Sequence, residues 1–305
     1  MLRKLNHFAS TKKNFILFDE LDKNEYFTSG GSCDIFKGKH GTKNILLKTF
    51  DSNHYEYEEG IIDDIKDELD IYDKIEKTNQ LCTCHGFSFS NLDKSYQTYI
   101  IIEDYNVNGD FSDFIKDKIY WTKYSEEKTL NRYEYYYKFR DIEWIYNLDR
   151  DYKIHLTESM CKALKSLHDK NIVHCDLKPN NMLLIEDEII LIDFGVARNL
   201  YDKNVIVTDE DMGTLGYMCE ELGFGICSKK SDIFSLGVCI LELWVGEIWQ
   251  EGNDYKQCRK EVLNSLKYLE SKEKELSKII KKCVLKDVKK RPYIQTVIKN
   301  LSTII

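Results

Sequence analysis

The sequence predicts an α+β fold, in which a small strand-rich part with one helix precedes a larger, mostly helical part. Three observations support this prediction. Short apolar segments surround a glycine turn between residues 15 and 50, and from about residue 111 the spacing becomes helical. The stretch SDIFSLGVCILELWVG (231–246) is almost wholly apolar, which predicts a helix buried in the centre of the larger part.

The size and composition indicate a globular protein. The chain has 305 residues, of which 42% are hydrophobic and 31% charged, enough for one large domain or two lobes. Its net charge of −8 argues against nucleic acid as a partner. Because no apolar run is long enough to span a bilayer, we expect no membrane partner either. The ten cysteines are scattered and the first residues do not form a secretory signal, which predicts reduced thiols in the cytoplasm or nucleus.

The smaller part is predicted from its periodicity. Three segments have strand character, namely NFILF (14–18), TSGGSCDIFKGK (28–39) and NILLKTF (44–50). Residues 57–76 have helical spacing, and the residues on the apolar face are Ile62, Ile65, Leu69, Tyr72 and Ile75. The segment YQTYIIIEDY (96–105) is a predicted buried strand.

The larger part has its own helical and strand signals. A helical stripe that ends before HDKN (168–171) comprises Leu156, Met160, Ala163, Leu164 and Leu167. MLLIEDEIILIDFG (182–195) reads as two short strands around an acidic turn. After the apolar helix we expect two more amphipathic helices.

Four polar motifs stand at ordered positions in this part. HCDLKPNN (174–181) places an aspartate, a lysine and an asparagine at fixed offsets, and DFG (193–195) follows a predicted strand. GTLGYMCEE (213–221) and KRPYI (290–294) come later. A single such motif is a polar turn as readily as a site, since Asn and Pro favour turns.

Together these motifs resemble those of the eukaryotic-type serine/threonine protein kinases, from about residue 24 to 302. The resemblance implies a bilobal protein kinase-like fold with an N-terminal extension (1–23), an N-lobe (24–104) and a C-lobe (105–305). It also implies that ATP and Mg²⁺ or Mn²⁺ are cofactors and that a protein is the substrate.

The resemblance implies catalytic or metal-binding roles for five residues of the C-lobe. Asp176 would accept the proton of the substrate hydroxyl, and Lys178 would stabilise the transferred γ-phosphate. Asn181 and Asp193 would hold the metal ion. Thr214 would hydrogen-bond to Asp176 and Lys178, as in the serine/threonine class.

The resemblance also implies an ATP site. Lys48 would bind the α- and β-phosphates with Glu68 as its partner. A solvated acid is the alternative reading of Glu68, but only Glu68 places Tyr72 four residues further along the apolar face. The remaining predicted ATP contacts are Gly30, Gly31, Ile35, Ile102, Leu183 and the backbones of Glu103 and Tyr105.

The sequence departs from the family pattern at five positions. Aligned with the glycine-rich loop, it places Thr28, Gly30 and Cys33 at the three glycine positions, and Leu46 replaces the usual alanine near the adenine. Cys175 stands where many relatives have arginine, so control by phosphorylation of the activation segment is not expected. Glu220 replaces a proline before Glu221, which is expected to pair with Arg291.

Two questions remain open from the sequence. The tyrosine-rich insertion at about 120–152 fits either an added element that packs on its own lobe or a docking surface for a protein partner. The function is predicted to be that of an active serine/threonine kinase. A pseudokinase scaffold and a small-molecule kinase are the alternatives, and the kinase residues retained favour activity.

Overall fold

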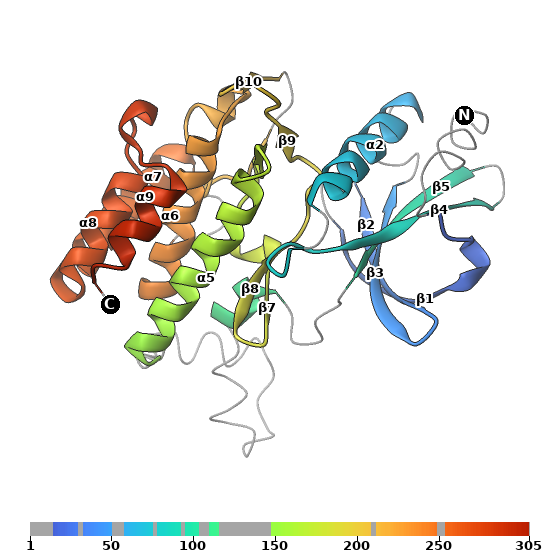
Figure 1. Cartoon of the computed structure of the whole chain (residues 1–305), viewed down its shortest axis with the longest axis horizontal. Helices are drawn as coiled ribbons and strands as arrows, with labels where there is room; N and C mark the ends of the chain where they lie inside the picture. Colours follow the sequence, from blue (N-terminus) through green and yellow to red (C-terminus); the bar gives the residue numbers. More distant parts are fainter. Residues whose placement is uncertain are drawn as a thin grey trace, which may run out of the picture. The chain divides into compact units, whose positions relative to one another are not determined.

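The computed structural model describes the chain as two compact units. It covers residues 15–29, 33–50, 58–75, 78–92, 95–103, 110–115, 148–208, 212–248 and 254–304. The first unit comprises Met1–Val107 and Asp193–Gly195, and the second comprises Asn108–Ile192 and Val196–Ile305. The first is rich in strands and the second is mostly helical, which confirms the predicted α+β class (Figure 1).

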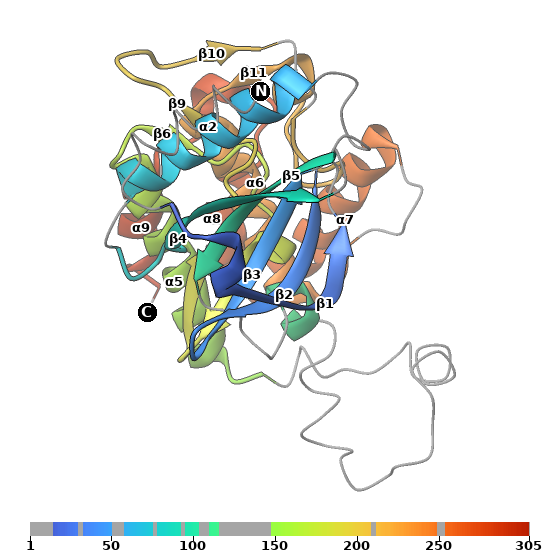
Figure 2. The same ribbon diagram turned by 90° about the vertical axis from the view of Figure 1, so that its right-hand side faces the viewer.

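The first unit is built on one antiparallel sheet with strand order β1-β2-β3-β5-β4. The strands are β1 (Leu21–Ser29), β2 (Asp34–His40), β3 (Lys43–Phe50), β4 (Cys84–Leu92) and β5 (Ser95–Glu103). The helix α2 (Glu58–Ile75) contacts β4, and Figure 2 shows it beside the sheet. Ile65, Leu69, Tyr72 and Ile75 of α2 are buried, which confirms its predicted apolar face; the side chain of Ile62 lies outside the described residues.

The expected strand NFILF is not a strand of this sheet. Phe15 forms one isolated parallel bridge with Phe87, and Phe18–Glu20 is a short 3₁₀ helix, η1. The apolar residues of the segment serve packing instead, because Ile16 and Phe18 contact the core cluster of Leu21, Ile45 and Leu47. The sheet itself begins at Leu21, three residues before the predicted start of the lobe.

The second unit contains five long or medium helices and three two-stranded ladders among its described residues. The helices are α5 (Arg150–His168), α6 (Lys229–Val245), α7 (Tyr255–Lys272), α8 (Lys274–Cys283) and α9 (Ile294–Leu301). The ladders pair β6 (Ile172–Val173) with β9 (Arg198–Asn199), β7 (Met182–Ile185) with β8 (Glu188–Leu191), and β10 (Ile206–Val207) with β11 (Ile226–Cys227). Three helices follow α6, where the sequence had predicted two.

The helix α6 forms the centre of this unit. Every residue from Ser231 to Trp244 is buried, as the apolar sequence predicts. A capping box between Ser228 and Ser231 satisfies backbone donors at its start. At Gly237 a Cβ atom would lie only 2.8 Å from Cβ of Cys283 on α8, so the glycine allows the two helices to pack closely.

The insertion lies mostly outside the described residues. Of the predicted segment 120–152, only residues 148–152 are described, and the last three of these already belong to α5. Tyr152 hydrogen-bonds to Asp187 at 2.7 Å, and Arg150 pairs with Glu273 at 2.8 Å. The last three residues of the predicted insertion thus form the first turn of α5.

Candidate active site

The first unit contains a charged cluster whose lysine and glutamate are buried, whereas the side chain of its aspartate is 41% exposed. Lys48, on β3, places its Nζ 2.7 Å from Oε1 of Glu68 on α2 and 2.7 Å from Oδ1 of Asp193. Lys48 and Glu68 are 3% and 1% exposed. Burial works to lower the pKa of Lys48, but the carboxylates of Asp193 and Glu68 outweigh it and hold the pKa well above its ordinary value. Lys48 is therefore a fixed cation, and we call these three residues the Lys48 cluster.

Aromatic packing holds Asp193 in this cluster. The next residue, Phe194, is fully buried, and its ring lies 5.4 Å from that of Tyr72 in an edge-to-face arrangement. Tyr72 stands one helical turn after Glu68, so one face of α2 positions both the ion pair and the aromatic contact. Asp193 itself has a φ of +62°, a left-handed conformation that is uncommon for a residue other than glycine.

The second unit contains a smaller polar triangle. The carboxylate of Asp176 accepts a hydrogen bond from the Thr214 hydroxyl at 2.7 Å, and Lys178 Nζ lies 2.8 Å from its other oxygen. Lys178 also donates to the Thr214 hydroxyl at 2.7 Å. We call these three residues the Asp176 cluster. They are partly exposed, with 15% of the side chain of Asp176 and 22% of that of Lys178 accessible to solvent.

Asn181 fixes the shape of the loop that carries this cluster. Its Nδ2 donates to the backbone oxygen of Asp176 at 2.8 Å and to Oδ2 of the same residue at 3.1 Å. The loop ends in the 3₁₀ helix η3 (Pro179–Asn181), which leads directly into β7. Because Nδ2 is used by Asp176, the amide oxygen is the atom that Asn181 can offer to a cation.

Asp232 on α6 anchors the loop that carries Asp176. The backbone N–H groups of His174 and Cys175 donate to the carboxylate of Asp232 at 2.9 and 3.0 Å. His168 Nε2 also lies 2.8 Å from Oδ2 of Asp232, and both side chains are buried. The contact of His168 was not predicted from the sequence, where the only signal was a histidine at the end of an apolar helical stripe.

Cys175 fills a buried position inside this anchor. It is 1% exposed and has a φ of +66°, so its backbone turns sharply between His174 and Asp176. A hydrogen bond with the Cys227 thiol and burial raise the pKa of Cys175 well above its ordinary value. Cys175 is therefore a neutral buried thiol, and its contact with Cys227 was not predicted from the sequence.

Of the other predicted ATP contacts, the structure describes some in full, some by their backbone only and some not at all. Ile35 is half-buried on β2 opposite Lys48 of β3, and Leu183 is buried on β7. Ile102 and Glu103 pair with Leu46 and Ile45 as the last residues of β5, but their side chains are not described. Gly30, Gly31 and Tyr105 lie outside the described residues.

Cys33, at the third glycine position, is buried next to the described part of β2. Burial raises the pKa of its thiol to about 12, so it is not a reactive thiolate.

The predicted ion pair between Glu221 and Arg291 is present. Two nitrogens of the Arg291 guanidinium contact the two oxygens of Glu221, and the second of these distances is 3.0 Å. Arg291 is 2% exposed and also donates from Nε to the backbone oxygen of Leu285 at 2.7 Å. Burial works to raise the pKa of Glu221, but the hydrogen bonds from Arg291 prevail and its pKa lies below the ordinary value. The pair is therefore charged.

Glu220, the residue that replaces the family proline, forms a second ion pair in this region. Its Oε2 lies 2.9 Å from Nζ of Lys286. The departure from the family pattern thus introduces a surface ion pair immediately beside the buried pair of Glu221 and Arg291.

The first unit thus holds a charged lysine between two carboxylates, and the second holds a carboxylate that contacts a lysine and a threonine hydroxyl. A model of the protein kinase domain matches residues 22–301, and the chain therefore belongs to the protein kinase family. The fold class and the resemblance predicted from the motifs are confirmed by this match.

Several characterised kinases are similar to parts of the chain. The serine/threonine-protein kinase MPS1 of Encephalitozoon cuniculi is 32% identical over 151 residues, 47% of this chain and 25% of that protein. The serine/threonine-protein kinase mph1 of Schizosaccharomyces pombe is 41% identical over 97 residues, 28% of this chain and 14% of that protein.

A viral protein is also similar. The putative serine/threonine-protein kinase R436 of Acanthamoeba polyphaga mimivirus is 32% identical over 156 residues, 50% of this chain and 56% of that protein. The chain thus spans less than two thirds of each of these relatives. Over the part of the chain that the structure describes, no helix is long and apolar enough to cross a membrane.

Proposed function

We propose that the chain is a serine/threonine protein kinase that transfers the γ-phosphate of ATP to a hydroxyl group of a protein substrate. The observation that carries this proposal is the Asp176 cluster, in which a carboxylate is oriented by a lysine and a threonine hydroxyl within 2.8 Å. Phosphoryl transfer requires positioning and charge neutralisation more than covalent chemistry, and this cluster offers both.

In the proposed mechanism Asp176 orients the substrate hydroxyl and accepts its proton. Its carboxylate is held in one orientation by Thr214 and Asn181, so little reorganisation is needed when the substrate arrives. Lys178 places a positive charge beside the same carboxylate, where it can stabilise the negative charge on the transferred phosphoryl group.

The Lys48 cluster is proposed to bind the ATP phosphates. Lys48 is buried, charged and held from two sides, which suits a residue that must present one ammonium group in a fixed place. Glu68 positions Lys48 and does not contact the nucleotide in this proposal. Ile35, Leu183, Ile102, the glycine turn (Gly30, Gly31) and the backbones of Glu103 and Tyr105 are the proposed contacts for the rest of ATP.

The donor atoms available fit a magnesium or manganese ion. The amide oxygen of Asn181 and the carboxylate of Asp193 are hard oxygen ligands of the kind these ions prefer. The ion would supply charge neutralisation on the ATP phosphates. The proposal also places the protein inside the cell, in cytoplasm or nucleus, since all ten cysteines are free thiols and nine of them are buried.

Transfer from labelled ATP tests this proposal. Purified protein is incubated with ATP labelled at the γ-phosphate and with Mg²⁺ or Mn²⁺, beside Asp176→Asn and Asp193→Asn variants, and modified residues are mapped by mass spectrometry. We expect label on serine or threonine with the parent protein only. Absence of label, together with no rise in melting temperature on adding ATP, would contradict the proposal and favour a scaffold that binds a protein partner.

A further inference from the structure

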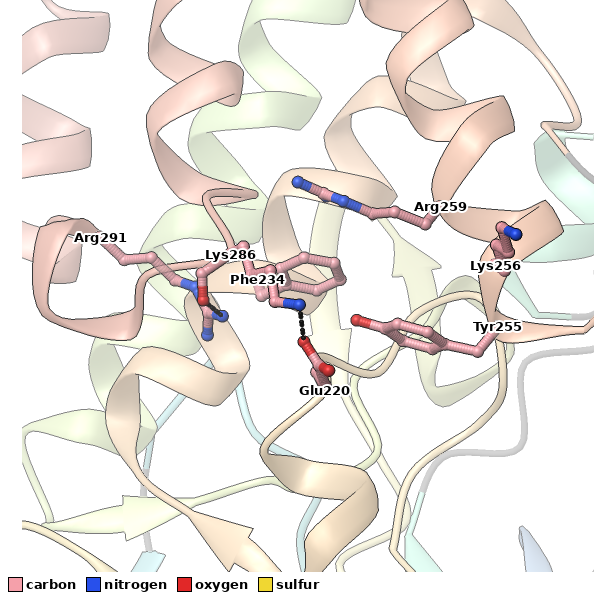
Figure 3. A pocket seen from close by; sticks show the side chains of 7 residues that line it. All are labelled: Glu220, Phe234, Tyr255, Lys256, Arg259, Lys286 and Arg291. Carbon is pink, nitrogen blue, oxygen red and sulfur yellow. Dashed lines mark hydrogen bonds and ion pairs between the residues drawn. The ribbon is translucent and has the colours of Figure 1, made fainter.

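A cavity of about 290 Å³ in the second unit is lined by basic and aromatic side chains. Its walls come from α6, α7 and the segments around Glu220 and Lys286, and the side chains of Phe234, Tyr255 and Arg259 point into the same space (Figure 3). All of these residues belong to one unit. None of them belongs to the Lys48 or Asp176 clusters, so this cavity, which we call the basic pocket, is a separate feature.

The basic pocket carries more positive charge than its acids neutralise. Four basic side chains line it, and Glu220 is the one acid among the lining residues. Arg291 forms an ion pair with Glu221, and Lys286 forms one with Glu220. For the other two basic residues, Lys256 and Arg259, no ion pair is found among the described residues. The surplus is thus two positive charges.

Arg259 carries the strongest indication of a missing partner. Its Nη1 is buried without a hydrogen-bond partner in the described structure, and its guanidinium lies 5.5 Å from the centre of the Phe234 ring. Burial and the neighbouring Arg291 lower the pKa of Arg259. A buried guanidinium nitrogen without an acceptor costs free energy, and an anion in the pocket would remove that cost.

The surplus charge and the walls of the pocket indicate what kind of anion fits. A phosphate monoester carries about −1.5 to −2 charges near neutral pH, which matches a surplus of two, whereas one carboxylate would neutralise only half of it. Guanidinium groups also bind phosphate oxygens with a planar pair of donors. The rings of Phe234 and Tyr255 add apolar wall that free phosphate would not use, but that side chains of a peptide would cover.

We propose that the basic pocket binds a phosphorylated serine or threonine of a protein, so that the kinase docks substrates that already carry a phosphate group. That the bound protein is a substrate rests on the proposed function. The binding of the phosphorylated residue does not itself require phosphate transfer. Glu220 contributes by holding Lys286 at the edge of the pocket. Since Glu220 stands where the family has proline, its ion pair with Lys286 is not implied by the family resemblance.

Binding of a degenerate peptide library tests the proposal. A fluorescent library with a fixed central phosphoserine is titrated with the Asp176→Asn variant at physiological salt, beside the same library with unmodified serine. We expect binding of the phosphoserine library alone. Because this variant is expected to transfer phosphate at least about a hundredfold more slowly than the parent, and binding is measured without ATP, failure of docking and failure of the kinase assignment give separate results.

Single substitutions locate the binding site. On the same background, Arg259→Gln should weaken binding of the phosphoserine library about tenfold or more, as expected for a lost charge-assisted contact. Lys256→Gln should weaken it less, since Lys256 is exposed. Lys260→Gln, an exposed lysine on the same helix that does not line the pocket, is the matched control and should bind like its parent.

Three results would overturn the proposal. These are equal binding of the unmodified serine library, unchanged binding by a folded Arg259→Gln variant, and displacement of the phosphoserine library by inorganic phosphate at concentrations as low as those of the peptide itself. The last result would mean that the pocket takes phosphate rather than a protein. If Arg259→Gln does not fold, as judged by its melting curve, unchanged binding by Lys256→Gln decides against the proposal.

Discussion

The Lys48 cluster and the Asp176 cluster are built from similar parts but differ in burial and charge. The first joins one cation to two carboxylates, a formal charge of −1, and its lysine and glutamate are almost inaccessible to solvent. The second joins one cation to one carboxylate, a formal charge of zero, and remains partly exposed. Because buried charges depend on their partners for stability and exposed ones do not, the first cluster should serve both fold and function, and the second mainly function.

The largest expected effect comes from the partly exposed Asp176 cluster. Asp176→Asn should lower the transfer rate by about 10²–10⁴-fold, the usual contribution of a general base. Its free energy of unfolding should change by less than about 1 kcal/mol, because the site is partly solvated. Transfer of labelled phosphate and urea unfolding measure the two quantities. Asp151→Asn, an exposed acid on α5, is the control, and a large loss of stability in Asp176→Asn would remove the proposed contrast.

Lys48→Met should break the buried cluster. It leaves Glu68 without its cation inside the protein, which should cost about 3–5 kcal/mol of unfolding free energy. It should also abolish the rise in melting temperature that ATP produces in the parent. Urea unfolding and melting curves with and without ATP measure these effects. A Lys48→Met variant as stable as its parent would show that the cluster does not contribute to the fold.

A third test concerns a buried pair that is not in either cluster. The pKa of Glu221 is depressed, so its contribution is present above the ordinary value of 4.5 and is lost as the pH falls through the folded pKa. Glu221→Gln should therefore be less stable than the parent by about 1–3 kcal/mol near pH 6. The difference should shrink as the pH falls below 4.5. Urea unfolding at a series of pH values measures this difference in unfolding free energy. A difference between the parent and Glu221→Gln that grew as the pH fell would contradict the prediction.

The smallest effect is expected at the surface. Arg150 and Glu273 form an ion pair 2.8 Å apart, with the arginine side chain 46% exposed. Arg150→Ala should change the free energy of unfolding by no more than about 1 kcal/mol. Urea unfolding measures this change, with which the changes at the buried pairs are compared. If Arg150→Ala lost as much unfolding free energy as Lys48→Met, burial would not explain the difference between surface and buried pairs.

Local patterns predicted the elements, and the family resemblance predicted two buried ion pairs, but neither predicted the other tertiary contacts described above. Once the resemblance implied an acidic partner for Lys48, helical spacing selected Glu68 among several acids, since it fixed which residues share a face of α2. The contact of His168 with Asp232 spans 64 residues, and neither it nor the packing of Cys175 on Cys227 has a periodic signal. NFILF was misread for a related reason: alternation of apolar residues indicates burial, but it does not say whether a partner strand is present.

The residues that form the basic pocket could not be predicted from local sequence patterns either. Glu220 was recognised from the sequence only as a departure from a pattern. Its partner Lys286, and the position of Arg259 above Phe234, depend on how α6 and α7 pack, which no local pattern encodes.

The attachment of the catalytic loop to Asp232 has a consequence for hydrogen exchange. Loop amides usually exchange quickly with solvent, but the amides of His174 and Cys175 donate to a carboxylate on the most deeply buried helix of the unit. Their exchange requires α6 to be uncovered, so they should exchange as slowly as the amides of α6 itself. The segment that the proposed mechanism needs most would then also be among the last in its unit to open.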